Sequence, residues 1–128
     1  MTSNEWTQLE QAVMRLLLAG DDASLLLLRR QFERASLQSR EMTGVGLYTY
    51  FTVPDDLPRL PSDLSVAFGD VEATMPTLMY KAGFLLWISA GAIAFLEGYT
   101  YCEPWPEDTS GFSLAYISEQ RDISMLHT

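Results

Sequence analysis

Apolar residues in the first third of the chain recur at the spacing of an α-helix. In the segment TSNEWTQLEQAVMRLLLAG they form one stripe, which consists of Leu9, Ala12, Val13, Leu16 and Leu17. Thr2 and Glu5 have the spacing of a capping box, and Gly20 can take the left-handed conformation that ends a helix. The pattern therefore predicts a helix over about residues 3–19.

A second stretch with helical spacing follows after a short connection. Asp21 or Asp22 can cap the segment ASLLLLRRQFERAS, which predicts a helix over about residues 22–36. The short connection makes the two helices an antiparallel hairpin. The apolar face of the second helix, which we expect in the core, consists of Leu25, Leu28 and Phe32.

Beyond Ser39 the residues alternate in polarity and are often β-branched or aromatic, which is typical of strands. About five strands are expected, in the segments EMTGVGLYTYFTVP, LSVAFGDVEATM, KAGFLLWIS, AIAFLEGYTYC and GFSLAYIS. Gly44 and Gly46 indicate a bulge or the close approach of another backbone. The segment PDDLPRLPSD is predicted to be a surface loop, and EQRDISMLHT a short terminal helix or a frayed tail.

The order of these elements predicts the fold class. Helices followed by strands, without βαβ alternation, indicate an α+β protein. Strands joined by short turns indicate an antiparallel sheet. We therefore expect one domain over residues 1–128, in which an N-terminal helical hairpin packs on an antiparallel sheet of about five strands.

The apolar segment GFLLWISAGAIAFLEGYTYCEPWP contains a glutamate, Glu97, in its middle. Ala90-Gly91 is predicted to be a two-residue hairpin turn. The simplest register then pairs Ser89 with Ala92, Ile88 with Ile93, Leu86 with Phe95 and Phe84 with Glu97.

That register has consequences for both faces of the hairpin. The helices would cover the face that carries Trp87, and Glu97 would lie on the opposite face, where apolar residues give way to Tyr99 and Tyr101. Since both faces are apolar near the turn, we expect cover on both sides. The side chains predicted to be almost fully buried are Leu16, Leu17, Leu25, Leu28, Phe32, Leu85, Trp87 and Leu96.

Tyrosines and carboxylates share faces of several predicted strands and form the candidate site. Glu97 can be structural, satisfied by a tyrosine hydroxyl, Arg40 or Lys81. It can also be functional, as a carboxylate with a raised pKa in a half-apolar pocket. The candidate ligand-binding or interface residues are Tyr48, Tyr50, Asp70, Glu72, Glu97, Tyr99, Tyr101 and Trp105.

The charge of the chain narrows the classes of partner. There are 17 acidic and 8 basic residues, which give a net charge of −9. This balance argues against binding to nucleic acid, which needs clustered Lys and Arg, and against anionic membrane surfaces. The charge either serves solubility alone or steers a basic protein partner to this surface.

Cysteine content and hydropathy indicate where the protein acts. The single Cys102 cannot form an intramolecular disulfide, which favours a reducing compartment. The first residues lack the pattern of a signal peptide. The longest apolar stretch, from Ala82 to Leu96, is shorter than the ~20 residues that a membrane span needs. We therefore expect a soluble, cytoplasmic protein.

No catalytic motif is found. The one histidine, His127, is the penultimate residue, which argues against Ser–His and Cys–His dyads and against a zinc site. The glycines of GVG lack the spacing of a phosphate-binding loop. Glu103 beside Cys102 would raise the pKa of a thiol nucleophile. Acid pairs drawn from Asp70, Glu72 and Glu97 are a weak signal, and no metal or cofactor is predicted.

Part of the chain resembles other proteins. The segments REMTGVGLYTYFTVP, GDVEA and GFLLWISAGAIAFLEGYTYCEPWP, within residues 37–106, resemble a pattern in small uncharacterised bacterial proteins, and no activity follows from it. In size, acidity and layout the chain is also similar to bacterial toxin-immunity proteins. That class is defined by role and contains many folds, so no functional residue is carried over.

Three hypotheses of function follow. The first is an interaction protein, such as an immunity or antitoxin-like protein, whose acidic, tyrosine-rich sheet face binds a basic partner. The second is a small-ligand binder or a carboxylate-based enzyme with Glu97 in a pocket. The third is a structural or homo-oligomeric protein. A flat exposed patch favours the first, an enclosed cavity around Glu97 the second, and a self-complementary patch the third.

Overall fold

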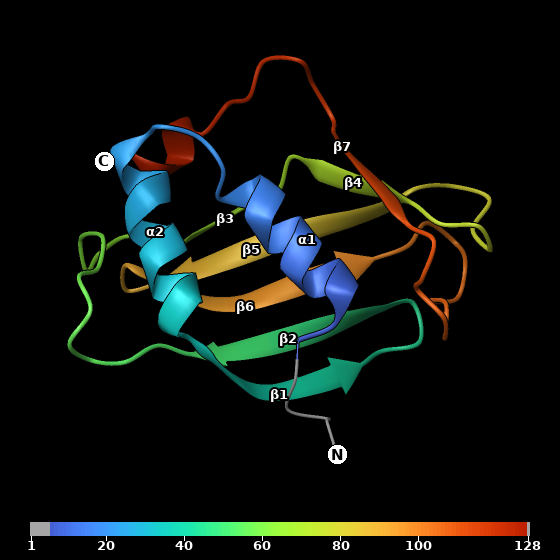
Figure 1. The fold of residues 1–128 in the computed structure, drawn as a ribbon, viewed down its shortest axis with the longest axis horizontal. Coiled ribbons are helices and arrows are strands. Elements are labelled where there is room, and N and C mark those ends of the chain that lie inside the picture. The colour runs from blue at the N-terminus through green and yellow to red at the C-terminus, as the bar shows by residue number, and fades with distance from the viewer. Residues whose placement is uncertain (1–5, 128) are drawn as a thin grey trace.

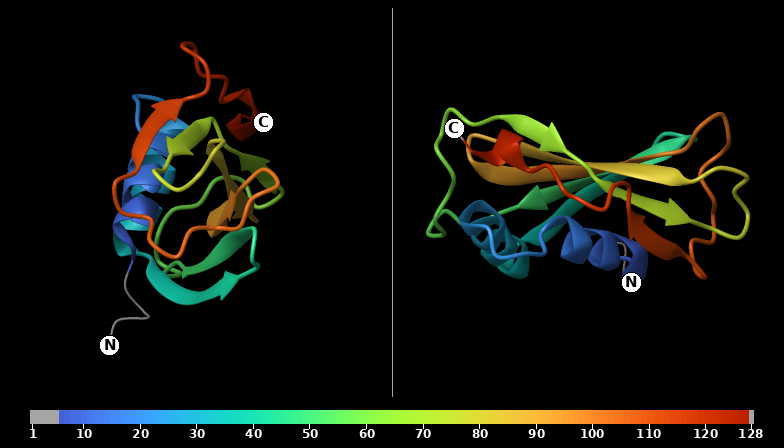
Figure 2. Two further views of the ribbon diagram at one scale, coloured as in Figure 1. Left: turned by 90° about the vertical axis from the view of Figure 1, so that its right-hand side faces the viewer. Right: turned by 90° about the horizontal axis from the view of Figure 1, so that it is seen from above.

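The computed structural model describes residues 6–127 and consists of two helices followed by a sheet. The helices, α1 (Gln8–Leu17) and α2 (Ala23–Arg34), lie on one face of a seven-stranded antiparallel sheet (Figure 1). Neither α-helix covers the opposite face (Figure 2). The predicted α+β class and antiparallel sheet are confirmed, with seven strands in place of about five.

The strands are β1 (Ser36–Met42), β2 (Gly46–Thr52), β3 (Val66–Phe68), β4 (Val71–Thr74), β5 (Ala82–Ser89), β6 (Ala92–Tyr99) and β7 (Ser113–Tyr116). Their order in the sheet is β1-β2-β6-β5-β4-β7, and β3 pairs with β5 beside β4. The β5–β6 hairpin therefore lies at the centre of the sheet. A short 3₁₀ helix, η1 (Ser124–Leu126), follows the last strand.

The first helix begins later than predicted. Its N-cap is Thr7, and a capping box joins Thr7 to Glu10: the Glu10 backbone N–H donates to Thr7 Oγ1 at 3.0 Å, and the Thr7 N–H donates to Glu10 Oε1 at 2.8 Å. The predicted box of Thr2 and Glu5 lies outside the described residues. At the other end the C-cap is Leu18, and Gly20 has the expected positive φ of 118° two residues further on.

The second helix is capped as predicted, but it ends earlier. The carboxylate of Asp22 accepts hydrogen bonds from the backbone N–H groups of Ser24 and Leu25. The helix ends at Arg34, and the chain continues directly into β1. Only its end, Glu41 and Met42, lies in a predicted strand, because the sequence SLQSREM is polar and lacks the β-branched and aromatic residues typical of strands.

Two predicted strands are each divided in the structure. The first contains the end of β1, the turn that follows it and all of β2: Gly44 (φ 89°) lies in the turn, and Gly46 packs against the backbone of Gly98. The expected close backbone approach is therefore found at Gly46. The second predicted strand becomes β3 and β4, which pair with successive parts of β5 and are separated at residues 69–70.

The β5–β6 hairpin has the predicted turn but a different register. Ala90 and Gly91 have φ values of 51° and 79°, as a tight turn with two left-handed residues requires. Ser89 pairs with Ala92 and Ile88 with Ile93, as predicted. The register then shifts, so that Trp87 pairs with Phe95. The shift makes Ala94 the extra residue of a β-bulge. The pairings predicted beyond this point are therefore wrong. The structure instead pairs Leu86 with Leu96, Leu85 with Glu97, Phe84 with Gly98 and Gly83 with Tyr99.

The bulge reverses the predicted faces of β5, whereas Leu96 and Glu97 of β6 lie on the predicted sides. Phe84, Leu86 and Leu96 point towards the helices and are buried, whereas Trp87 is 36% exposed on the other side. The prediction that the helices cover Trp87 is therefore wrong, as is the expected cover on both faces. Of the other predicted core residues, Leu17, Leu25 and Leu28 are buried, and Leu16, Phe32 and Leu85 are half-buried.

Buried polar groups fix the helices on the sheet. Glu10 of α1 is 2% exposed, and its carboxylate accepts hydrogen bonds from Arg40 of β1 (2.6 and 2.8 Å) and from the Thr49 hydroxyl of β2 (2.6 Å). Gln31 of α2 is fully buried; its amide accepts from the Ile93 N–H at 2.9 Å and donates to the carbonyl oxygen of Gly91 at 3.2 Å. These bonds define how each helix lies across the sheet.

The C-terminal segment is anchored and is not a frayed tail over its described part. The Arg121 guanidinium pairs with Asp70 at 2.5 Å and donates to the carbonyl oxygens of Leu17, the last residue of α1, and of Ala19. Leu126 is buried, and the His127 ring contacts Asp22 at 2.6 Å. The described helices include none long and apolar enough to cross a bilayer.

Leu28→Ala should lower the free energy of unfolding by about 2–5 kcal/mol, because Leu28 is fully buried between α2 and the sheet. Leu26 on the same helix is 40% exposed, and Leu26→Ala should change stability by less than about 0.5 kcal/mol. Urea denaturation measures both. Equal losses in the two variants would contradict the orientation of α2.

Glu10→Gln should destabilise the fold by about 3 kcal/mol at neutral pH, because the neutral amide cannot replace the buried carboxylate in its ion pair with Arg40 and its hydrogen bond from Thr49. Burial acts to raise the pKa of Glu10, but hydrogen bonds from Arg40, Thr49 and Thr7 outweigh it and hold the pKa below the ordinary 4.5. The charged carboxylate therefore contributes stability that is complete above the unfolded pKa and is lost as pH falls through the folded pKa.

The free-energy difference between wild type and Glu10→Gln should accordingly shrink as pH is lowered below about 4.5. Denaturation curves at several pH values measure it, with the exposed Glu33→Gln as a control that stays close to wild type throughout. A difference of the same size at neutral and acidic pH would show that the charge of Glu10 is not what stabilises the structure.

Candidate functional site

The sheet face that the helices leave open carries a cluster of large side chains, which we call the aromatic face. Residues paired across adjacent strands point to the same side of a sheet. Three rows on β2, β6 and β5 therefore share this side: Tyr50–Phe95–Trp87, Tyr48–Glu97–Leu85 and Gly46–Tyr99–Gly83. The aromatic face consists of Tyr48, Tyr50, Leu85, Trp87, Phe95, Glu97 and Tyr99.

The rings of the aromatic face pack on one another. Trp87 and Phe95 are stacked, with 5.5 Å between ring centroids and 17° between planes. Tyr50 lies 5.3 Å from Phe95 on its other side, and Tyr48 meets Phe95 edge-on at 5.8 Å. Because the rings lie on three paired strands and support each other, they form a preorganised surface with little side-chain freedom left to lose on binding.

Glu97 lies in the middle of this surface and is half-buried. The indole N–H of Trp87 donates to Glu97 Oε1 at 3.1 Å. We expected a substantially buried glutamate with a hydrogen bond from a tyrosine or an arginine. The hydrogen bond is present, but its donor is a tryptophan, and the side chain is only half-buried. Arg40 lies on the helix side with Glu10, and Lys81 pairs with Glu72.

Tyr99 extends the aromatic face towards one end of the sheet. Its ring lies directly over Gly83, where any Cβ would come within 2.4 Å of it, and it meets Tyr101 edge-on at 5.6 Å. Burial, the neighbouring Tyr101 hydroxyl and the charge of Glu97 raise the pKa of Tyr99 to about 12. Tyr99 therefore stays neutral at physiological pH.

The remaining predicted site residues fall into two groups. Glu72 pairs with Gly83 and so borders the aromatic face, where it forms a 2.9 Å ion pair with Lys81. Asp70 and Trp105 are elsewhere. Asp70 is bound to Arg121 at the end of α1, and Trp105 is buried on the helix side against Gly98. The expectation that Asp70 and Trp105 belong to this surface is therefore wrong.

Exposed apolar side chains gather at the end of the sheet next to Tyr99. The Glu103 carboxylate accepts hydrogen bonds from the backbone N–H groups of Met79 and Tyr80, and the Val45 carbonyl accepts one from the Thr100 N–H. Three loops are thus bonded together at the right-hand end of the sheet in Figure 1. The side chains that they expose are Val45 (55%), Met79 (80%), Tyr80 (57%) and Tyr101 (52%).

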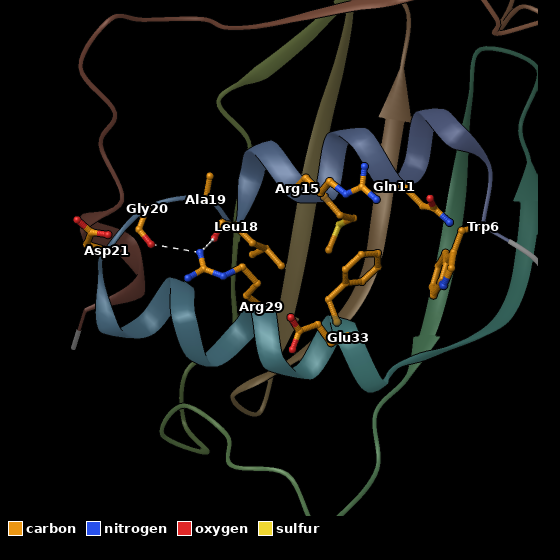
Figure 3. A pocket seen from close by; sticks show the side chains of 11 residues that line it. Trp6, Gln11, Arg15, Leu18, Ala19, Gly20, Asp21, Arg29 and Glu33 are labelled. Atoms are coloured by element: carbon orange, nitrogen blue, oxygen red, sulfur yellow. Dashed lines mark hydrogen bonds between the residues drawn. The ribbon is translucent and has the colours of Figure 1, made fainter.

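A groove of about 690 Å³ lies between the two helices, on the other side of the molecule (Figure 3). Its floor is apolar, with Met14 and Phe32, and the charged side chains of Arg15 and Glu33 lie on its opposite rims. Arg29, at one end, donates to the carbonyl oxygens of Leu18 and Gly20. Since acid and base are balanced here, the groove does not favour one charge of ligand.

The second hypothesis requires Glu97 to line an enclosed cavity. Glu97 does not line the helix groove, nor the cleft of about 570 Å³ beside Tyr80, Lys81, Tyr101 and Cys102. The described residues also contain no group of three or more side chains that could hold a metal ion. The arrangement around Glu97 is that of an open surface.

No protein-family model, curated protein or solved structure matches this chain.

Sequence reasoning missed the central part played by Phe95 and Trp87. The alternation along each strand was visible, but placing both rings on the open face depends on the bulge at Ala94. One signal was present: Phe95, Glu97 and Tyr99 alternate with the small residues Ala94 and Gly98 and the core residue Leu96. Such alternation is typical of a strand with one face towards solvent.

Proposed function

We propose that this is an interaction protein that uses the aromatic face of its sheet to bind a basic protein partner. The observation that carries the proposal is the rigid cluster of Tyr48, Tyr50, Trp87 and Phe95 on a sheet face that neither α-helix covers. Large aromatic clusters on a surface are typical of protein-binding sites, and tyrosine and tryptophan are frequent anchors there.

The charges on this side support a basic partner. Glu97 lies within the aromatic face, Glu41 of β1 is paired with Tyr48 on the same side, and Glu72 lies at its border. Two copies of this face brought together would place like charges against each other, which disfavours a homo-oligomer through it. The net charge of −9 would also speed the approach of a basic protein.

An immunity or antitoxin-like protein is one form that this function can take, with a basic toxin as the partner. A reducing compartment such as the cytoplasm suits the exposed free thiol of Cys102. A small-ligand binder with Glu97 in a pocket has less support, because Glu97 lies on an open face.

A photo-crosslinking residue in place of Tyr50 should capture a basic protein in the cells that make this chain. The same residue in place of Leu26, which is exposed on α2, should not capture it. With the partner purified, Tyr50→Ser combined with Trp87→Ser should weaken binding at least about tenfold, and Leu26→Ser by less than about twofold. Affinity should also fall with added salt.

Two results would contradict the proposal. One is the same partner captured equally from both positions. The other is a double variant that keeps a native NMR spectrum and binds the partner as tightly as wild type does.

A further inference from the structure

The carboxylate of Glu97 is oriented but only partly used. One oxygen, Oε1, accepts the hydrogen bond from the Trp87 indole at 3.1 Å. Among the described residues no other hydrogen bond or ion pair is made by this carboxylate, and the two cations that the sequence offers as partners lie elsewhere: Arg40 is paired with Glu10 on the helix side, and Lys81 with Glu72. A partly desolvated carboxylate without a cationic partner is a strong acceptor for a cation brought by another molecule.

The rings around Glu97 suit a planar cation. Tyr48 is its cross-strand neighbour on β2, and Trp87 holds it from β5. The face of an aromatic ring attracts cations, because the ring quadrupole places negative electrostatic potential above the ring plane. A guanidinium group can stack on a ring and at the same time donate two parallel hydrogen bonds to a carboxylate, whereas an ammonium group is a strongly hydrated point charge that cannot stack.

We propose that the aromatic face recognises an arginine side chain of its partner, which pairs with Glu97 and stacks on Tyr48. The inference rests on the function proposed above and names the chemistry that the site reads. Trp87 is a positioning residue in this scheme, because its indole N–H holds the carboxylate in place. The surrounding rings exclude water from the pair, as the rim of a binding hot spot does.

Two peptides of alternating glycine and basic residues test this inference. They have the same length and charge, and one is built with arginine and the other with lysine. Titration of ¹⁵N-labelled protein, followed by NMR, gives both the affinity and the location of each peptide. We expect the arginine peptide to bind about fivefold more tightly than the lysine peptide and to shift the indole N–H signal of Trp87.

Matched variants separate recognition from general attraction. Glu97→Gln should remove the preference for arginine and weaken the arginine peptide about fivefold. Glu33→Gln removes the same charge on the helix side and should leave both affinities within about twofold of wild type. Trp87→Phe keeps a ring but loses the N–H donor, so it should reduce the arginine preference while the lysine peptide binds as before.

The outcomes distinguish the two proposals. Equal affinity for both peptides, with shifts on the aromatic face, would overturn arginine recognition and leave a basic-partner surface in place. If arginine binding survives Glu97→Gln unchanged, the inference is also wrong. Shifts confined to residues of the helix side, or no shifts with either peptide, would count against the proposed function itself.

Discussion

The arrangement of this protein depends on one extra residue in β6. Ala94 shifts the register between the pair of Ile88 with Ile93 and the pair of Trp87 with Phe95. The β6 side chains beyond Ala94 therefore lie on the opposite face from the one that a regular hairpin would give them. As a result Phe84, Leu86, Ile88, Ile93 and Leu96 all point towards the helices and are buried. An unbulged hairpin would place Phe95 and Glu97 on that same side, where a carboxylate would require a partner in the core.

The helices are fixed on the covered face by a few buried polar contacts. Glu10 with Arg40 and Thr49 joins α1 to the β1–β2 hairpin, and Gln31 joins α2 to the turn between β5 and β6. A different placement of either helix would break these contacts and leave buried polar groups without hydrogen-bond partners. Because unsatisfied buried groups cost free energy, the contacts favour one placement of each helix. The consequence is a sheet with one closed face and one open face, and the candidate site is the open one.

The sequence predicts elements with a strong local signal and misses those that depend on tertiary pairing. The two helices, the Asp22 cap and the Ala90-Gly91 turn follow from spacing and capping chemistry. The polar edge strand β1 carries no such signal, and the bulge at Ala94 adds one residue without changing composition. Simple alternation along β2 and β6 is enough to predict the shared face of Tyr48, Tyr50, Glu97 and Tyr99. Asp70 and Trp105 were misplaced because a gap between strands and a loop set their positions.

The measurement that tests this account most directly is the pattern of NOEs from the Trp87 indole ring. The bulged register predicts NOEs between the rings of Trp87 and Phe95, which are 5.5 Å apart, and further NOEs from Phe95 to Tyr50. An indole ring that instead shows NOEs to the methyl groups of Leu25 or Leu28 on α2 would contradict it. Trp87 would then lie under the helices, and the open aromatic face would not exist.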